Sequence, residues 1–327
     1  MTLTESQKPN YSRRFFWLAA FVVVLFGGYS VGWFYLANVV ETQTKAAIAG
    51  VNRDGVTAEC VNAVARGYPF RIGLFCDRVA FTDADGGIAI SAGGFRSAGQ
   101  IYDPKRLVAE LDGPARIDLP QSSPLALDWH GLRASVRLAQ PVPERISLEG
   151  TTLKASMASG EPLATIGAFE AHMRPNGQDL DLAGSVAGLS IDQSLLDGRK
   201  LPSLSSQSDL TVKNGVKLVG AGVQDLRGQS GTIRTLMVST GPETGLLVSG
   251  PFSIAKDGLL DADLTVTVRD PKGLSTVLAE AFPESRERIV SSFSGLAALG
   301  GAPTLPLKVV KGKASLGFIP LGEIPPL

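Results

Sequence analysis

The sequence lacks an excess of either charge. Lys+Arg and Asp+Glu number 31 each, charged residues make up only 19% of the chain, and no run of Lys and Arg is longer than two residues. Proteins that bind nucleic acids normally carry a basic excess that displaces counterions from phosphates. We therefore expect no nucleic-acid partner.

Histidine is also scarce, since His130 and His172 are the only two in the chain. A zinc site needs three or four nitrogen, sulfur or oxygen ligands, and two distant histidines do not supply them. The sequence has no phosphate-binding G-x-x-x-x-G-K-[ST] motif, and no G-x-G-x-x-G motif between a strand and a helix. We expect no metal, no cofactor and no catalytic residue, so the protein is predicted not to be an enzyme.

Cysteine occurs only at Cys60 and Cys76. In an oxidising compartment this spacing suits a disulfide, worth roughly 3 kcal/mol on the chain-entropy model. The alternative is a pair of buried free thiols.

One long uncharged run is present, from Phe15 to Leu36, with aromatic residues at both ends. Its length of about 22 residues spans roughly 33 Å as a helix, which is enough to cross a bilayer. Lys8, Arg13 and Arg14 precede it. Positive flanks stay in the cytoplasm, so residues 1–14 are predicted to be a cytoplasmic tail and 15–36 a signal anchor. A cleaved signal peptide is the alternative, but its apolar core would be shorter.

Two short motifs overlap inside this run. Gly28 and Gly32 form G-x-x-x-G, which lets helices approach closely and would allow a homodimer. The same segment matches the nucleophile elbow G-x-S-x-G through Ser30. That elbow requires a strand-to-helix turn, which a transmembrane helix cannot provide.

The remaining chain divides into a short helical stalk, 37–58, and a β-rich extracytoplasmic domain, 59–327. The stalk is expected to end at Arg53-Asp54-Gly55. The abundance of glycine (37) and proline (20) favours many strands joined by turns. Apolar residues alternate in short runs, such as 70–76, 125–129, 132–138, 210–212, 246–248 and 260–268. This pattern predicts a long curved antiparallel sheet with one apolar face, either open or partly closed as a barrel or sandwich.

Turns and polar positions follow from the same pattern. Asn214-Gly215 and Lys256-Asp257-Gly258 lie between alternating runs and predict hairpins. Asp179 and Asp181 fall on the polar face of a strand, so we expect both to be solvated.

A helical insert is predicted at about 271–299. Asp270 suits a helix N-cap, and Pro271 suits the first helical position. The apolar residues of the insert could pack on the sheet or form a mobile lid; as candidate lid residues we take Leu274, Leu278, Phe282 and Phe293.

The segment Gly67-Tyr68-Pro69-Phe70-Arg71 lies between the cysteines, just before a strand. Proline restricts Tyr68 to extended or turn geometry. The segment is either a rigid structural corner or, with Tyr68, Pro69, Phe70 and Arg71, a docking surface or groove mouth.

Three stretches carry a family resemblance: GYPFRIGLFC at 67–76, SGPFSIAKDGLLDADLTV at 249–266 and LGFIPLGEIPPL at 316–327. With the N-terminal anchor they resemble the family called domain of unknown function 2125, found in Gram-negative envelopes. That resemblance implies a single-pass protein of the inner membrane with its C-terminal domain in the periplasm. It transfers no catalytic residue. The strand pattern is also distantly similar to AsmA-type envelope proteins, whose curved sheet has an apolar inner face.

These observations predict a periplasmic protein, anchored in the inner membrane, that binds or transfers lipid or another apolar ligand. The alternative is a scaffold or interaction module that contacts other envelope proteins.

Overall fold

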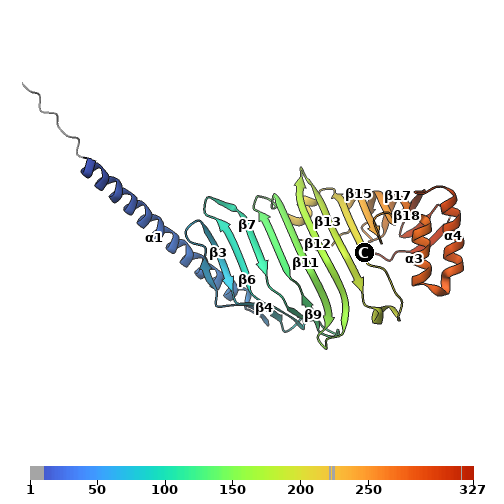
Figure 1. The fold of residues 1–327 in the computed structure, drawn as a ribbon, viewed down its shortest axis with the longest axis horizontal. Helices are drawn as coiled ribbons and strands as arrows, with labels where there is room; N and C mark the ends of the chain where they lie inside the picture. Colours follow the sequence, from blue (N-terminus) through green and yellow to red (C-terminus); the bar gives the residue numbers. More distant parts are fainter. Residues whose placement is uncertain (1–10, 221, 223–224, 318) are drawn as a thin grey trace, which may run out of the picture.

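The structure, a computed structural model, describes residues 11–220, 222, 225–317 and 319–327. Within these residues a long N-terminal helix, α1 (Tyr11–Val51), precedes a 20-stranded antiparallel sheet. Two further helices, α3 (Pro271–Ala281) and α4 (Arg286–Ala298), lie at the end of the sheet opposite α1 (Figure 1). The prediction of a mainly β fold with an open antiparallel sheet is confirmed.

Helix α1 is long and apolar enough to cross a membrane, and its apolar window has a mean hydropathy of 1.9. The helix continues without a break from the apolar run into the predicted stalk. The chain then turns at Asp54 (φ 51°) and Gly55 (φ 82°), as the sequence predicted. Asn52 holds this turn, because its side chain accepts a hydrogen bond from the Ala58 amide at 2.6 Å. The first strand begins at Val56, before the predicted boundary of 59. Most of the predicted cytoplasmic tail, residues 1–10, lies outside the described residues.

The strands follow the chain in two groups. The first group is β1 (Val56–Val61), β2 (Val64–Arg66), β3 (Arg71–Cys76), β4 (Arg78–Asp83), β5 (Ile88–Ala92), β6 (Phe95–Gln100), β7 (Asp103–Leu111), β8 (Ala115–Asp118), β9 (Leu125–Asp128) and β10 (Gly131–Arg137). The second group is β11 (Arg145–Met157), β12 (Pro162–Asn176), β13 (Asp179–Ile191), β14 (Leu204–Val212), β15 (Ser230–Ser239), β16 (Gly245–Ile254), β17 (Leu260–Arg269), β18 (Thr304–Val310), β19 (Lys313–Leu316) and β20 (Ile319–Glu323).

The sheet forks at β11. One edge of this strand pairs with β12. The other edge pairs with β10 along its first half and with β9 along its last four residues. Strands β7, β6, β3 and β2 continue from β10, while β8, β5, β4 and β1 continue from β9. The first third of the domain therefore has two layers, and within the described residues no pairing joins β1 to β2.

A small core lies between the two branches. Ala92, Ala115 and Trp129 are buried together, and partly buried apolar residues of both branches pack around them. The Trp129 indole donates a hydrogen bond to the Leu111 carbonyl at 2.7 Å, so its one polar group is paired. The disulfide between Cys60 on β1 and Cys76 on β3 joins the two branches, with Cα atoms 5.2 Å apart. The predicted disulfide is confirmed, but it links two layers and not the two strands of one hairpin.

From β11 to β20 the sheet is a simple meander, with each strand paired to the next. The hairpin predicted at Lys256-Asp257-Gly258 joins β16 to β17 and is confirmed. The hairpin predicted at Asn214-Gly215 is wrong. Gly215 begins a short helix, α2 (Gly215–Gly220), and the partner of β14 is Ser230–Ser239. Gly215 is buried against Leu180, where an added Cβ would lie 2.5 Å from the Leu180 Cβ, so this glycine serves close packing and not a two-residue turn.

The helical insert at 271–299 is confirmed as α3 and α4. The Asp270 carboxylate accepts a hydrogen bond from the Gly273 amide at 3.0 Å, as expected of an N-cap. Leu274 and Ala281 are buried within this region.

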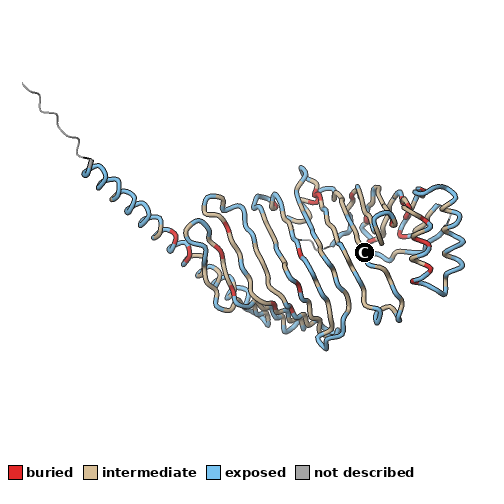
Figure 2. Tube along the Cα trace, in the orientation of Figure 1, coloured by how far each residue is buried: buried red, intermediate tan, exposed pale blue. Residues whose placement is uncertain are grey.

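Burial along the sheet is shallow. Figure 2 shows a few buried residues scattered along strands that are otherwise of intermediate exposure or exposed, while the first part of α1 is almost entirely exposed. No large side chain among the described residues is less than 2% exposed, and the small Ala281, at the end of α3, is fully buried. The apolar face of the meander is therefore only partly covered by the chain itself.

Candidate functional site

The main cavity with an apolar lining lies between α1 and the branch of the sheet that contains β3, β6, β7 and β10. Its volume is about 640 Å³, within the range of binding sites for small molecules. We call this cavity the anchor groove. Apolar side chains from α1 and from the sheet line it, chiefly Leu36, Val39, Val40, Ile72, Leu74, Leu107, Ala134, Val136 and Leu138.

Strand register explains why these side chains converge. Ile72 lies opposite Gly99, which lies opposite Leu107, and Leu107 lies opposite Val136. Residues opposite one another in a sheet share a face, so the alternating runs at 72–74 and 134–138 form one floor. Figure 1 shows the C-terminal part of α1 beside β3, and the α1 residues Leu36, Val39 and Val40 form one wall of the groove.

A close strand contact shapes the groove floor. A Cβ added to Gly73 would lie 1.7 Å from the Ser97 carbonyl oxygen, so only glycine lets β3 and β6 approach here. The Ser97 hydroxyl accepts a hydrogen bond from the Leu74 amide at 2.9 Å. The β3–β6 ladder has no paired residues between Ile72–Gly99 and Phe75–Arg96, and this side-chain bond joins the two strands in that gap.

The groove floor continues along the whole meander. Two rows of directly opposed positions on this face are Ala134–Leu148–Ala171–Gly184–Ser208–Leu236–Val248–Val266–Leu305 and Val136–Ile146–Met173–Leu182–Leu210–Ile233. Leu148 remains 37% exposed and is part of this open face. The anchor groove is thus the covered end of a longer apolar surface.

The predicted docking segment packs against α1 of its own chain. The Tyr68 ring stacks on Phe34 with centroids 5.9 Å apart, and its hydroxyl lies 2.8 Å from the Ser30 hydroxyl. The Trp33 indole donates to the Arg71 carbonyl at 2.9 Å, and the Tyr29 hydroxyl donates to the Pro69 carbonyl.

In the same segment Phe70 is 67% exposed. The segment thus forms a corner beside the groove, between α1 and β3, and its role in docking a partner stays a prediction.

The predicted lid residues lie far from the anchor groove. Leu274 is buried, and Phe282 and Phe293 belong to the helical region at the opposite end of the sheet (Figure 1). Leu278 is on α3 in the same region. The helices do not cover the anchor groove, so a lid role would concern only the far end of the apolar face and stays a prediction.

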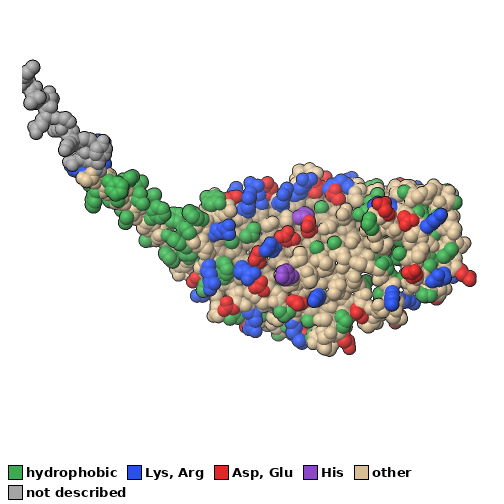
Figure 3. Space-filling model, in the orientation of Figure 1, with side chains coloured by type: hydrophobic (Ala, Val, Ile, Leu, Met, Phe, Trp, Pro, Cys, Tyr) green, Lys and Arg blue, Asp and Glu red, His purple; other side chains and the backbone are tan. Residues whose placement is uncertain are grey.

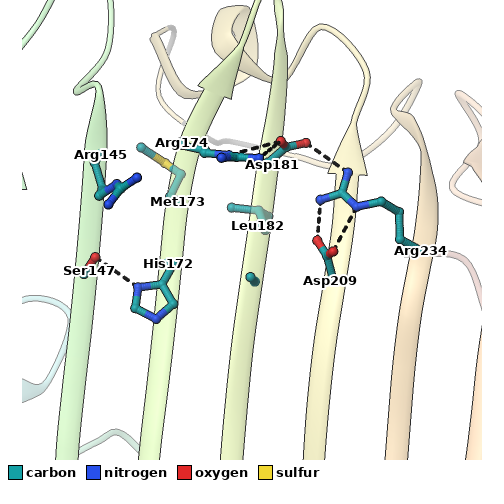
Figure 4. A pocket seen from close by; sticks show the side chains of 10 residues that line it. Arg145, Ser147, His172, Met173, Arg174, Asp181, Leu182, Asp209 and Arg234 are labelled. Carbon is teal, nitrogen blue, oxygen red and sulfur yellow. Dashed lines mark hydrogen bonds and ion pairs between the residues drawn. The ribbon is translucent and has the colours of Figure 1, made fainter.

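The opposite face of the sheet is polar and carries one feature that the sequence pattern missed. Asp181 was expected to be solvated, but it is only 6% exposed. Arg174 lies 3.2 Å and Arg234 3.1 Å from its carboxylate (Figure 4). The Thr211 hydroxyl also donates to this carboxylate, at 2.8 Å. Burial alone would raise the pKa of Asp181, but these hydrogen bonds outweigh it and hold the pKa below its ordinary value.

Arg234 also contacts Asp209, and hydrogen bonds to Asp209 and Asp181 raise the pKa of Arg234. The ion pairs of Arg174, Asp181, Asp209 and Arg234 thus link the four strands β12, β13, β14 and β15. The expectation for Asp181 failed because alternation identifies the face of a residue but not the long side chains that cover it.

Groups with catalytic chemistry meet at one place on this polar face. His172 lies 3.0 Å from the Ser147 hydroxyl and 3.4 Å from the Glu170 carboxylate. The imidazole and the carboxylate are 47% and 57% exposed on the strands of an open sheet. Within the described residues, no group of three or more His, Cys, Asp or Glu is arranged to hold a metal ion.

Comparisons with known proteins bear on the family and not on the ligand. No curated protein and no solved structure matches the chain, so the similarity to AsmA-type proteins is not shown. A family model described as "Uncharacterized protein conserved in bacteria (DUF2125)" matches residues 33–325, from the outer part of α1 to β20 and beyond. The chain therefore belongs to the DUF2125 family.

Proposed function

We propose that α1 anchors this protein in a bacterial inner membrane, with the sheet in the periplasm. Two observations support this topology: the exposed apolar length of α1 and the basic pair Arg13-Arg14 at its start. The disulfide also supports a periplasmic location of the sheet, because such bridges persist in oxidising compartments.

The anchor groove then binds the acyl part of a lipid or a similar apolar ligand, without catalysis. The observation that carries this proposal is the position of the groove. Leu36, the last residue of the predicted membrane span, lines it together with Val39 and Val40. An acyl chain leaving the bilayer along α1 would enter the groove without crossing water. From there the apolar face of the meander offers a continuous path away from the membrane.

The test is native mass spectrometry of the full chain released from nanodiscs, with lipid retained per protein as the readout. Ala134→Trp would fill the groove, and Val136→Asp would place a charge in it. Both changes should lower retained lipid at least tenfold. Ser135→Asp is the matched control, because neighbouring residues of a strand point to opposite faces and Ser135 does not line the groove.

Thermal unfolding of each variant separates loss of binding from loss of fold. Equal lipid retention in the wild type, in folded Ala134→Trp and in the Ser135→Asp control would remove the basis for a lipid-binding groove. The bound lipid, identified by mass, would name the ligand class.

A scaffold role is the second candidate, and the C-terminal edge of the sheet favours it. Strand β20 pairs only with β19 among the described residues, and its Ile319 and Leu321 side chains are 63% and 56% exposed. An unpaired edge of this kind can accept a strand from another protein. A photo-crosslinker at Leu321 that captures a single envelope protein in cells, while one at Lys256 captures none, would favour this role.

A further inference from the structure

Basic residues gather at one end of the strands that form the anchor groove. Lys and Arg side chains follow the upper edge of the sheet in Figure 3. Five Lys and Arg residues lie in the strand ends nearest α1, and we call them the basic rim: Arg71, Lys105, Arg106, Arg137 and Arg145. All five are exposed, and only two acidic residues, Asp103 and Glu144, lie in the same strand ends and turns. This local excess stands out in a chain with a formal net charge of zero.

Three of these arginines form a ladder. Arg106 lies directly opposite Arg137, and Arg137 lies directly opposite Arg145. Like charges in directly opposed positions destabilise a sheet. Elsewhere on the same strands the charges alternate, as where Glu110 lies 3.3 Å from Arg96 and 2.9 Å from Arg133.

The ladder is only partly compensated within the chain. Arg106 and Arg137 each have one local acidic partner, Asp103 at 3.6 Å and Glu144 at 3.2 Å. No carboxylate of a described residue lies within 4.0 Å of the charged atoms of Arg71, Lys105 or Arg145. A further anion outside the chain would offset the remaining repulsion.

The rim lies at the height where α1 would leave a bilayer. The corner at 67–71 contacts Tyr29, Ser30 and Trp33, which precede the end of the predicted span by about 5–10 Å along the helix. The turn between β6 and β7 is bonded to this corner, because the Ile101 amide donates to the Phe70 carbonyl at 3.2 Å. These turns would therefore lie at the border between the acyl chains and the headgroups.

Two further features fit that depth. Phe70 and Tyr102, at the tips of these turns, are 67% and 74% exposed, as is typical of aromatic side chains at a membrane interface. Pro104 and Leu138, next to Lys105 and Arg137, line the anchor groove together with Leu36. The rim is thus continuous with the groove mouth and with the end of the span.

We propose that the basic rim rests on the membrane surface and binds the headgroups of anionic phospholipids, so that the sheet leans against the bilayer with its groove mouth at the headgroup layer. This inference rests on the proposed anchoring by α1 but not on a ligand in the groove. An isolated anchor would leave α1 and the sheet free to tilt together relative to the bilayer. The rim fixes one edge of the sheet to the surface.

The test uses the full chain in nanodiscs of phosphatidylcholine, with or without phosphatidylglycerol. A fluorophore at Ala139→Cys, in the turn between β10 and β11, reports quenching by a headgroup nitroxide lipid. We expect several-fold stronger quenching when phosphatidylglycerol is present, and its loss at high salt. The triple change Arg106→Glu, Arg137→Glu and Arg145→Glu should reduce quenching to the level of a label at Asp257→Cys, near the other end of the sheet.

The matched control reverses three exposed charges on strands and turns far from α1, in β18 and in the β16–β17 and β18–β19 turns: Lys256→Glu, Lys308→Glu and Lys311→Glu. This control should leave quenching at Ala139→Cys unchanged. Quenching that is insensitive to lipid charge, or equal in both triple variants, would overturn the proposal. A label at Val23→Cys tests the premise separately. If a nitroxide on the acyl chains fails to quench that label, α1 is not in the bilayer, and both the anchoring and the rim proposals fail.

Discussion

Removing the disulfide should weaken the two-layered end of the domain by a predictable amount. The bridge closes a loop with a sequence separation of 16 residues. On the chain-entropy model a loop of this size contributes about 3 kcal/mol to the free energy of unfolding. For the double variant Cys60→Ala, Cys76→Ala we therefore expect a loss of about 3 kcal/mol. With an m-value near 3 kcal/mol/M, the urea midpoint would fall by about 1 M.

The structure provides its own reporter for this change. Trp129 lies in the core between the branches that the disulfide joins. In a background with Trp17→Phe and Trp33→Phe, urea unfolding of the full chain in detergent can be followed by Trp129 fluorescence alone. Reduced protein with both cysteines intact is the control and should match the double variant.

Two outcomes would refute this reasoning. A loss well below 1 kcal/mol would mean that the branches are held together without the bridge, through their shared core and α1. If the Trp129 transition were unchanged while circular dichroism of the whole chain showed a lower urea midpoint, the disulfide would stabilise only the end of the domain next to α1.

Three further predictions concern single residues. Gly73→Ala should destabilise the protein by about 2 kcal/mol, because its Cβ would lie 1.7 Å from the Ser97 carbonyl oxygen; thermal unfolding should show no such loss for Gly295→Ala, which meets nothing within 4 Å. Asp181→Asn should remove about 1–3 kcal/mol at neutral pH. The folded pKa of Asp181 is lowered, so its contribution is complete above its ordinary value of 3.8 and is lost as the pH falls through the folded pKa. Urea midpoints of wild type and variant should therefore converge as the pH falls below 3.8, and a difference that does not shrink at all in acid would contradict this assignment. Asp270→Ala should destabilise α3 by about 1 kcal/mol, because it removes the N-cap. Amide hydrogen exchange should then become faster than in the wild type within 271–281 and stay unchanged within 286–298.

Local patterns predicted the elements that depend on local chemistry. The apolar run at 15–36, the cap at Asp270 and the alternation at 72–74 and 134–138 each specify the structure of a few adjacent residues. They do not specify which strands meet. The groove floor exists because β3 and β10 share a face through β6 and β7, and these pairings between separate segments leave no local signal.

The fork at β11 shows the same limit. The alternating runs 125–129 and 132–138 predict two successive strands but not their partners. In the structure β9 and β10 do not pair with each other but lie along successive parts of one edge of β11. The exposure of Asp181 failed for a related reason, since Arg234 comes from β15 and joins Asp181 only when the sheet forms.

The number of strands in the meander sets how far the apolar face extends from the anchor groove. From β10 to β19 nine pairings follow in chain order. At about 4.8 Å per step, the face extends roughly 43 Å from the groove. Inserting or deleting one hairpin would change that length by about 10 Å without disturbing the register on either side. The distance from α1 to the far end of the apolar face is therefore set in steps of one hairpin, and a chain with more or fewer hairpins would extend a longer or shorter distance from its anchor.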